Sequence, residues 1–249
     1  MDIFGVINTS PDSLNTDSIA STTTQVHARA ASLIEDGADA FDLGGQGSTD
    51  VATEVSEQIE WSRIAEPLEV LVSLGRSVSV DTFHPGVARR AFQLGATHLN
   101  AADGMQHDAM WEVAAEFDVG VVVPFMIGDH PHRLRHTNGD PFDEMLSFFE
   151  ARLATAERFG MRPRCLLDPG TGFAPRNWLW DQRYVYQKHV YTHLDRLRVF
   201  DLPLYIPLPW KQTPQHRELL GIVLAHRPEY GRAHYPAVIR EAIREGGWD

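Results

Sequence analysis

The feature that most constrains the fold is a repeated pattern, in which a short apolar run ends in a carboxylate or carboxamide residue just before a turn. The pattern is clearest in residues 165–175, CLLDPGTGFAP, where an apolar run leads to Asp168 and then to a proline and glycines. It recurs at Asn8, Asp81 and Asn100. Short apolar runs bounded by turn residues are typical of buried parallel strands. The repeat therefore predicts several parallel strands, each with a polar residue at its carboxyl end.

Segments with helical periodicity alternate with these runs. Strands are predicted at residues 3–7, 38–43, 77–80, 97–99, 119–125, 164–167 and 202–208. Helices are predicted to start at Thr22, with Gln25 in a capping box, and to cover residues 59–74, 87–94, 110–117, 142–159 and 235–243. Residues 229–234 stand where an eighth strand belongs but are too polar to be a convincing one. The alternation predicts an α/β fold, a single (β/α)8 TIM barrel over residues 1–249, in which the segment before the eighth strand looks short.

Composition narrows the class of protein. With 249 residues, of which 43% are hydrophobic, the chain can bury a large core. A formal net charge of −12 and the absence of a basic run disfavour nucleic-acid binding, which needs clustered Lys and Arg. No apolar run is long enough to span a bilayer, and residues 1–7 lack the basic region of a signal peptide. The single cysteine, Cys165, has apolar neighbours and is expected to be a core thiol. We therefore expect a cytoplasmic enzyme with no nucleic-acid or membrane partner.

Polar residues at the strand ends predict a binding pocket, because in a (β/α)8 barrel the carboxyl ends of the strands meet at one mouth. Five of these residues are expected to face a common pocket: Asn8, Asp81, Asn100, Asp168 and Lys211. The alternative is that each residue caps a helix or orders its own loop. Independent caps would have no reason to follow a strand in every case, so a shared pocket is favoured.

Two further polar residues, Arg232 and His234, stand where the eighth strand would open into the mouth. Alternate positions on an extended segment point the same way, so both side chains could contact one phosphate group. An Arg-Ala-His triplet is common in proteins, so its meaning depends on the rest of the pocket.

Other motifs have plainer interpretations. The glycines of residues 44–50 miss the spacing of a dinucleotide-binding fingerprint, which disfavours a Rossmann fold. His130, His132 and His136 could bind a metal, but their spacing fits no closed tetrahedral site, and a surface loop is the better interpretation. The aromatic residues of segment 178–197 could line a ligand groove, although a helix packed on the barrel or the contact face of a homodimer is favoured.

Taken together, these residues resemble the dihydropteroate synthase family, the pteroate synthases of folate synthesis. The resemblance covers nearly the whole chain in order. The matching stretches are residues 7–13, 37–39 with 42–45, 79–82, 95–96 with Asn100, 168–170 with 172–173, Lys211, and Arg232 with His234.

The resemblance implies a transferase that displaces pyrophosphate from the CH2 carbon of a small-molecule pterin substrate by an arylamine. It implies pterin-binding roles for Asp81, Asn100, Asp168 and Lys211, and pyrophosphate-binding roles for Asn8, Arg232 and His234. It also implies that Asn8 binds Mg2+ as cofactor and that Lys211 and Asp81 act in catalysis. Such a reaction needs stabilisation of the leaving group more than a general base.

The side of the pocket that would hold the arylamine departs from the family pattern. Asp50 stands where an Arg is expected, Leu14 replaces a Phe, and Pro209-Trp210 replaces the Ser-Arg that precedes the family's Lys. Ala101 stands where an Asp usually follows the Asn. The alternative hypothesis is therefore a divergent paralogue that binds a pterin or a reduced folate without condensing it with p-aminobenzoate.

Overall fold

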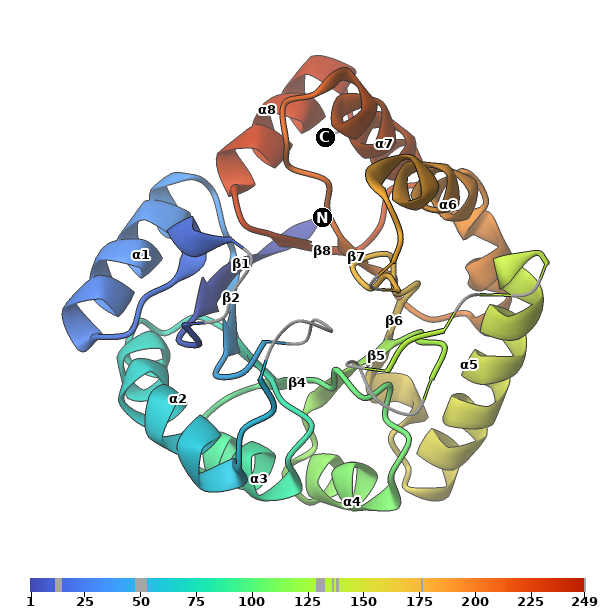
Figure 1. Cartoon of the computed structure of the whole chain (residues 1–249). Helices are drawn as coiled ribbons and strands as arrows, with labels where there is room; N and C mark the ends of the chain where they lie inside the picture. The colour runs from blue at the N-terminus through green and yellow to red at the C-terminus, as the bar shows by residue number, and fades with distance from the viewer. Residues whose placement is uncertain are drawn as a thin grey trace.

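The computed structural model describes residues 1–11, 15–47, 53–128, 133–135, 137, 139–175 and 177–248. Within these ranges, parallel strands form a central barrel that is surrounded by helices (Figure 1). Some residues that were singled out in the sequence lie outside the described ranges: Leu14, Asp50, His130, His132 and His136.

Eight parallel strands make up the barrel. They are β1 Asp2–Asn8, β2 Ala40–Gly44, β3 Val78–Asp81, β4 His98–Asn100, β5 Gly120–Pro124, β6 Cys165–Asp168, β7 Tyr205–Pro207 and β8 Tyr230–Ala233. Their order in the sheet is β6-β5-β4-β3-β2-β1-β8-β7. The two strands at the ends of this order, β6 and β7, are joined by a bridge between Leu167 of β6 and Leu204, the residue before β7. This bridge closes the barrel. The predicted (β/α)8 barrel is confirmed.

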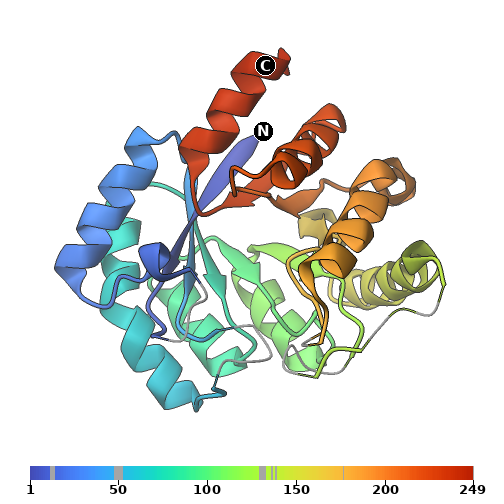
Figure 2. The same cartoon turned by 45° about the horizontal axis from the view of Figure 1, so that its top comes forward.

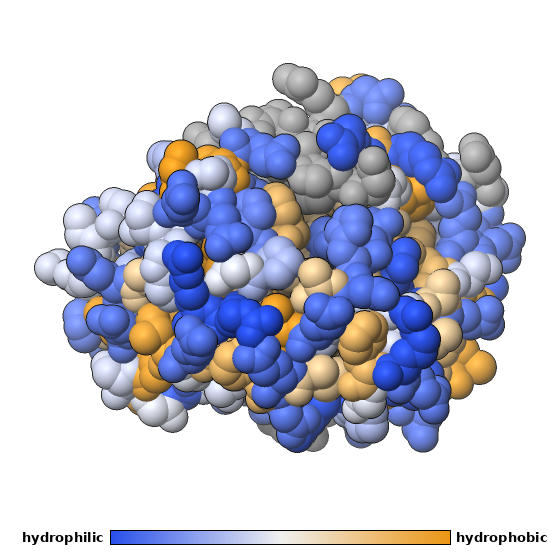
Figure 3. Space-filling view, turned by 90° about the horizontal axis from the view of Figure 1, so that it is seen from below, coloured by the Kyte–Doolittle hydropathy of each residue, from blue (hydrophilic) through white to orange (hydrophobic). Residues whose placement is uncertain are grey.

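Helices form the outer layer of the molecule (Figure 2). They are α1 Thr23–Glu35, α2 Glu57–Ser73, α3 Pro85–Gln93, α4 Asp108–Phe117, α5 Pro141–Arg158, α6 Trp180–Thr192, α7 Pro214–Ala225 and α8 Pro236–Gly246. The predicted capping box is present, because the side chains of Thr22 and Gln25 each accept a hydrogen bond from the other's backbone N–H. On the face shown in Figure 3, hydrophilic and hydrophobic residues are intermixed. No helix in the described part of the chain is long and apolar enough to cross a membrane.

The region between β7 and β8 is more regular than the sequence pattern predicted. Helix α7 occupies a segment in which no helix was expected, and β8 pairs with both β1 and β7 in spite of its polarity. Thr213 caps α7 by accepting a hydrogen bond from the His216 N–H at 3.3 Å. Backbone pairing on both sides explains β8, because a strand inside a barrel takes its stability from its neighbours as well as from its own residues.

Two apolar regions surround the strands, one on each face of the sheet. The larger fills the space between strands and helices, and Cys165 lies in it, buried as predicted, with its thiol donating to the Met161 carbonyl at 3.4 Å. The smaller fills the barrel interior and consists of Phe4, Ala40, Val122, Leu166 and Tyr205. Since side chains alternate along a strand, inward-facing residues nearer the carboxyl ends lie above this interior cluster, towards the mouth.

Candidate active site

A buried ion pair lies at the mouth of the barrel, between Asp42 on β2 and Arg232 on β8. Asp42 is fully buried, and Arg232 Nε donates to its Oδ2 at 2.5 Å. Asn100, at the end of β4, donates its amide to the two carboxylate oxygens of Asp42 at 3.4 and 3.5 Å. A buried carboxylate is tolerated when a charged partner and hydrogen bonds compensate for its lost hydration. Asp42 therefore joins Arg232 and Asn100 in one polar network.

Asp81, at the end of β3, extends this network. Arg232 Nη2 lies 3.7 Å from Asp81 Oδ2, and the register of the sheet places Asp81 between Gly44 of β2 and Asn100 of β4. Burial raises the pKa of Asp81, the neighbouring Asp42 carboxylate raises it further, and Arg232 opposes both. Two carboxylates thus share one guanidinium, which makes this part of the mouth suited to a ligand with N–H donors.

Asp168 ends β6 and is held by the turn that follows it. Its Oδ1 accepts a hydrogen bond from the Gly170 N–H at 2.7 Å. Gly170 has a φ of +70°, and a Cβ there would collide with the Phe125 carbonyl, so the turn requires glycine. Burial raises the pKa of Asp168 to about 7, while the Gly170 N–H and Arg232 lower it. The carboxyl is therefore fixed in orientation and can change its protonation state near neutral pH.

Asn8 ends β1 on the other side of the mouth. Its Nδ2 donates to Ser18 Oγ at 2.8 Å, which ties the strand end to the short turn Thr16–Ser18. Asn8 Oδ1 faces Gly44, where an added Cβ would lie 3.3 Å from that oxygen. The small residue at Gly44 therefore leaves room beside an amide oxygen that lies close to the acid network.

His234 follows β8 and is neutral in this environment. Burial, together with the charges of Arg232 and Arg29, lowers the pKa of His234 to about 3. Its backbone carbonyl accepts a hydrogen bond from Arg29 Nη2 at 2.5 Å, which fixes the position of the residue. Among the described residues, no side chain or backbone group hydrogen-bonds to its Nδ1. A neutral imidazole can donate one hydrogen bond to an anion without bringing a charge of its own.

Lys211 is not brought to the acids in this conformation. The residue is exposed, and its Nζ lies 5.6 Å from the centroid of the Trp210 ring. It lines a cavity of about 380 Å³ to which α7 contributes Arg217 and Leu220 and α8 contributes Val238. The structure thus groups four of the predicted site residues around Asp42: Asp81, Asn100, Asp168 and Arg232. Asn8 and His234 lie at the rim of this group. Lys211 lies apart from it.

Asp42 is the residue of this network to which the sequence pattern assigned no role. The pattern consists of polar residues at the ends of apolar runs, whereas Asp42 lies in the middle of Ala40–Gly44, two residues before the end of β2. The available signal was a charged residue inside an otherwise apolar strand. Such a residue on an inward face is costly unless it has partners, which makes it a candidate site residue.

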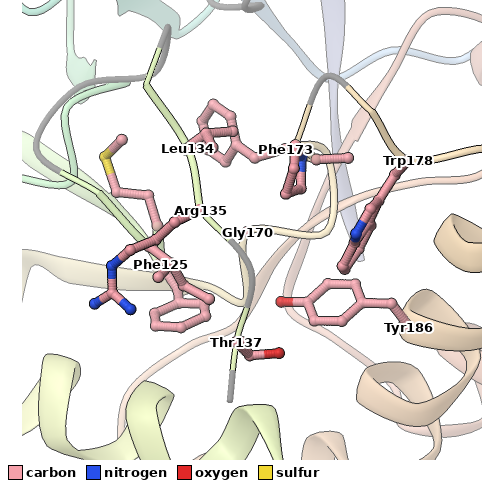
Figure 4. Close-up of a pocket in the computed structure, with 12 residues that line it drawn as sticks. Phe125, Leu134, Arg135, Thr137, Gly170, Phe173, Trp178 and Tyr186 are labelled. Carbon is pink, nitrogen blue, oxygen red and sulfur yellow. The ribbon is translucent and has the colours of Figure 1, made fainter.

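An aromatic wall flanks the loop that carries Asp168. Figure 4 shows Trp178 and Tyr186 together beside Phe173 and Gly170, and the Trp178 and Tyr186 rings meet edge to face with centroids 5.2 Å apart. A cavity of about 30 Å³ lies against this wall, and a second one of about 650 Å³ shares Trp178 and Tyr186 with it. A helix packed on the barrel was favoured here from the sequence, which agrees with α6. Trp178, just before this helix, and Tyr186, within it, also line these cavities.

Comparison with known proteins gives independent evidence on the family of this chain. The model of a family described as pterin binding enzyme matches residues 4–207. A dihydropteroate synthase type-2 from Escherichia coli is 32% identical over 216 residues, which cover 84% of this chain and 76% of that protein. The structure of a Thermus thermophilus dihydropteroate synthase in complex with 4-aminobenzoate has a TM-score of 0.80 and 27% identity, and the match covers 99% of this chain and 93% of that one. A Yersinia pestis dihydropteroate synthase, solved with a sulfonamide drug complex, has a TM-score of 0.86 at 24% identity over 99% of this chain and 92% of that one, which shows the common fold.

Proposed function

Because the chain belongs to the pterin-binding enzyme family, as a transferase of the dihydropteroate synthase type, we propose that it joins a dihydropterin to an arylamine with release of pyrophosphate. The observation that carries this proposal is the group of three buried acids, Asp42, Asp81 and Asp168, at one barrel mouth. Arg232 is the guanidinium that contacts Asp42 and Asp81, and one guanidinium among three carboxyl groups leaves an excess of acceptor oxygens over cationic N–H donors. That excess suits a ligand edge rich in N–H donors.

Pterin recognition follows from hydrogen-bond chemistry. A pterin presents an amino group and ring nitrogens along one edge, and carboxylates accept from such donors. Asp81 and Asp168 would accept from the ring, while the Asn100 amide can both donate and accept. Lys211 would hydrogen-bond the carbonyl side of the ring, which requires its side chain to turn from the α7–α8 cavity towards the mouth.

The pyrophosphate of the substrate would lie at the rim. His234 offers a neutral imidazole, and Arg232 is close enough to hold a phosphate oxygen if its side chain leaves the acids. The Asn8 amide oxygen, beside which Gly44 leaves room, is a hard donor of the kind that Mg2+ prefers, and substrate phosphates would supply further oxygens. Bound Mg2+ would neutralise negative charge on the departing pyrophosphate.

The chemical step is a displacement at the pterin CH2 carbon. The lone pair of the arylamine nitrogen forms the new C–N bond as the C–O bond to pyrophosphate breaks, and pyrophosphate leaves with the bonding electron pair. The amine nitrogen then loses one proton to solvent. The residues of this chain contribute by holding the ring and by stabilising the leaving group, which are the two demands of such a step.

Genetic complementation tests the proposal. The chain should restore growth of a strain that lacks its own dihydropteroate synthase, and Asp168→Asn expressed at the same level should not. Failure of the wild-type chain to complement, when it is soluble and folded, would contradict the proposal.

A binding comparison separates the proposal from the folate-binding alternative, which the matched dihydropteroate synthases do not favour. In calorimetry, we expect tighter binding of 6-hydroxymethyl-dihydropterin pyrophosphate than of methyltetrahydrofolate, because only the former carries phosphate groups that the residues at the rim can bind. The reverse order would support the alternative.

The proposal extends to a cytoplasmic homodimer. Helix α6 and the turn before it expose two apolar side chains, Leu179 at 74% and Val185 at 66%, a feature of subunit contacts. Light scattering of the purified chain would measure its mass in solution, and Val185→Glu should shift a dimer towards monomer. A monomeric wild-type chain would contradict this extension without affecting the pterin site.

A further inference from the structure

Two hydroxyl groups inside the barrel are buried and have no hydrogen-bond partner in the described part of the chain. Tyr205 on β7 and Ser79 on β3 are both 0% exposed. Among the described residues, none makes a hydrogen bond with Tyr205 Oη or Ser79 Oγ. Burying a hydroxyl without a partner is destabilising, so buried polar groups of this kind call for an explanation.

Both side chains face the barrel interior close to the acid network. Ser79 is the register partner of Asp42, so the two residues point to the same interior face of the sheet. On β7, Pro207 is the register partner of Arg232, and Tyr205 lies two residues earlier on the same face. The Tyr205 ring meets Phe4 of the interior apolar cluster at 5.4 Å between centroids. Tyr205 therefore joins the interior apolar cluster to the acid network, and Ser79 lies level with Asp42 and two residues before Asp81 on β3.

The surroundings keep the Tyr205 hydroxyl protonated. Burial raises the pKa of Tyr205 well above 10, and the charge of Asp42 raises it further. The Asp42 oxygens accept from Arg232 and Asn100, and no hydrogen bond joins Tyr205 to that carboxylate. A phenol in this position has both a donor and an acceptor to offer to a ligand that reaches it.

We propose that Tyr205 and Ser79 form the polar floor of the pterin site, and that their hydroxyl groups hydrogen-bond the innermost edge of the bound heterocycle. This inference rests on the proposed function, because it assigns these residues to the same pocket. The ligand class is a flat heterocycle whose buried edge carries ring nitrogens and an amino group. The cost of the unpartnered hydroxyls in the free chain is then recovered when the ligand supplies the missing partners.

This assignment predicts effects of opposite sign on stability and on binding. Tyr205→Phe keeps the ring contact with Phe4 and removes only the hydroxyl. The free variant should melt at the same temperature as the wild type or higher, because an unpartnered polar group has been removed. Its affinity for pterin should fall by about tenfold, because the ligand edge loses one hydrogen bond. Ser79→Ala should behave in the same way.

The chain offers a matched control in Tyr191, which is also buried but whose hydroxyl lies 2.9 Å from both Thr171 Oγ1 and the Pro207 carbonyl. Tyr191→Phe should lower the melting temperature, because it removes an existing bond, and should retain pterin affinity. The experiment is calorimetric titration with 6-hydroxymethyl-dihydropterin pyrophosphate and thermal melting of the wild type and the three variants.

Each outcome is decisive. If Tyr205→Phe binds the pterin like the wild type, the floor assignment is wrong although the proposed function stands. A melting temperature that falls as in Tyr191→Phe would also overturn the assignment, because the hydroxyl would then have a partner, such as an internal water molecule, in the free chain. If the wild type itself binds no pterin, the proposed function fails first and this inference fails with it.

Discussion

Arg232 Nε lies 2.5 Å from Asp42 Oδ2, and this contact joins the last strand of the barrel to the second across the mouth. The resemblance to pterin enzymes implied that Arg232 holds pyrophosphate, whereas in the structure it neutralises part of a buried acid group. The two roles are compatible if Arg232 leaves Asp42 and contacts a phosphate when the ligand binds. The N–H donors of the pterin would then hydrogen-bond the acids in place of Arg232. Arg232 is therefore expected to affect the binding of pterin as well as that of its pyrophosphate ester.

The buried pair should stabilise the fold. Asp42→Asn leaves the Arg232 charge without its main partner, and breaking a buried pair in this way costs about 3–5 kcal/mol. Denaturant unfolding should show this loss. As a control, Glu116→Gln breaks the exposed Arg89–Glu116 pair and should cost less than about 1 kcal/mol. Equal, small losses in both variants would mean that Arg232 is adequately solvated without Asp42.

Asp168→Asn should abolish tight pterin binding and leave the fold intact. The asparagine oxygen can still accept the hydrogen bond of the Gly170 N–H, so the turn is kept. The other carboxylate oxygen becomes an NH2 group that faces N–H donors of the ring, and such a mismatch costs about 1–3 kcal/mol, or one to two decades of affinity. Titration with pterin and thermal melts measure the two effects. Wild-type affinity in this variant would show that Asp168 is not part of the pocket.

Stability should depend on pH through Asp168. The pKa of this group is about 7 in the folded chain, against about 4 in an unfolded chain. Between these values the folded chain holds a proton that the unfolded chain has released, so the contribution of Asp168 is fully present below pH 4 and is lost as the pH rises to 7. Pterin affinity should rise over the same range, because the carboxylate is the form that accepts N–H donors.

Unfolding of the wild type and Asp168→Asn from pH 5 to pH 8 measures this dependence. The free energy of unfolding should fall more steeply with pH in the wild type than in the variant. Parallel curves would mean that Asp168 does not titrate in this range.

The position of Lys211 can be followed by chemical labelling, because the chain has only two lysines, Lys188 and Lys211. If Lys211 turns towards a bound pterin, saturating pterin should slow its reaction with an amine-specific reagent severalfold. Lys188 pairs with Glu218 at 2.6 Å on the outer helices and provides an internal control. Mass spectrometry after short exposures gives both rates. Unchanged labelling of Lys211 in the presence of bound pterin would remove it from the pterin site.

The sequence predicted the barrel and most of the mouth because both depend on local patterns. An apolar run followed by a polar residue and a turn identified Asp81, Asn100 and Asp168, and parallel topology brings strand ends together whatever the details of packing. The sequence did not predict helix α7, because the first turn of this helix is polar and its apolar residues begin only at Leu219.

The features of the site that the sequence did not predict depend on contacts across the barrel. The pairing of Asp42 with Arg232, 190 residues apart in the chain, is set by the closure of the sheet and has no local signal. The hydroxyl of Tyr205 has no partner among the described residues, and this could not be predicted either, because a Tyr in an apolar strand looks in the sequence like an ordinary core residue. The direction of the Lys211 side chain depends on rotamers and on its neighbour Trp210, which sequence spacing does not determine.

The most direct test of the proposed transfer is a single-turnover reaction of the purified chain with 6-hydroxymethyl-dihydropterin pyrophosphate, p-aminobenzoate and Mg2+, with the pterin product identified by mass and the pyrophosphate measured in parallel. The wild type should form one dihydropteroate and one pyrophosphate per substrate consumed, and Asp168→Asn should form both far more slowly at the same substrate concentration. Pterin binding without product at high p-aminobenzoate, by a chain that is correctly folded, would contradict the proposed transfer.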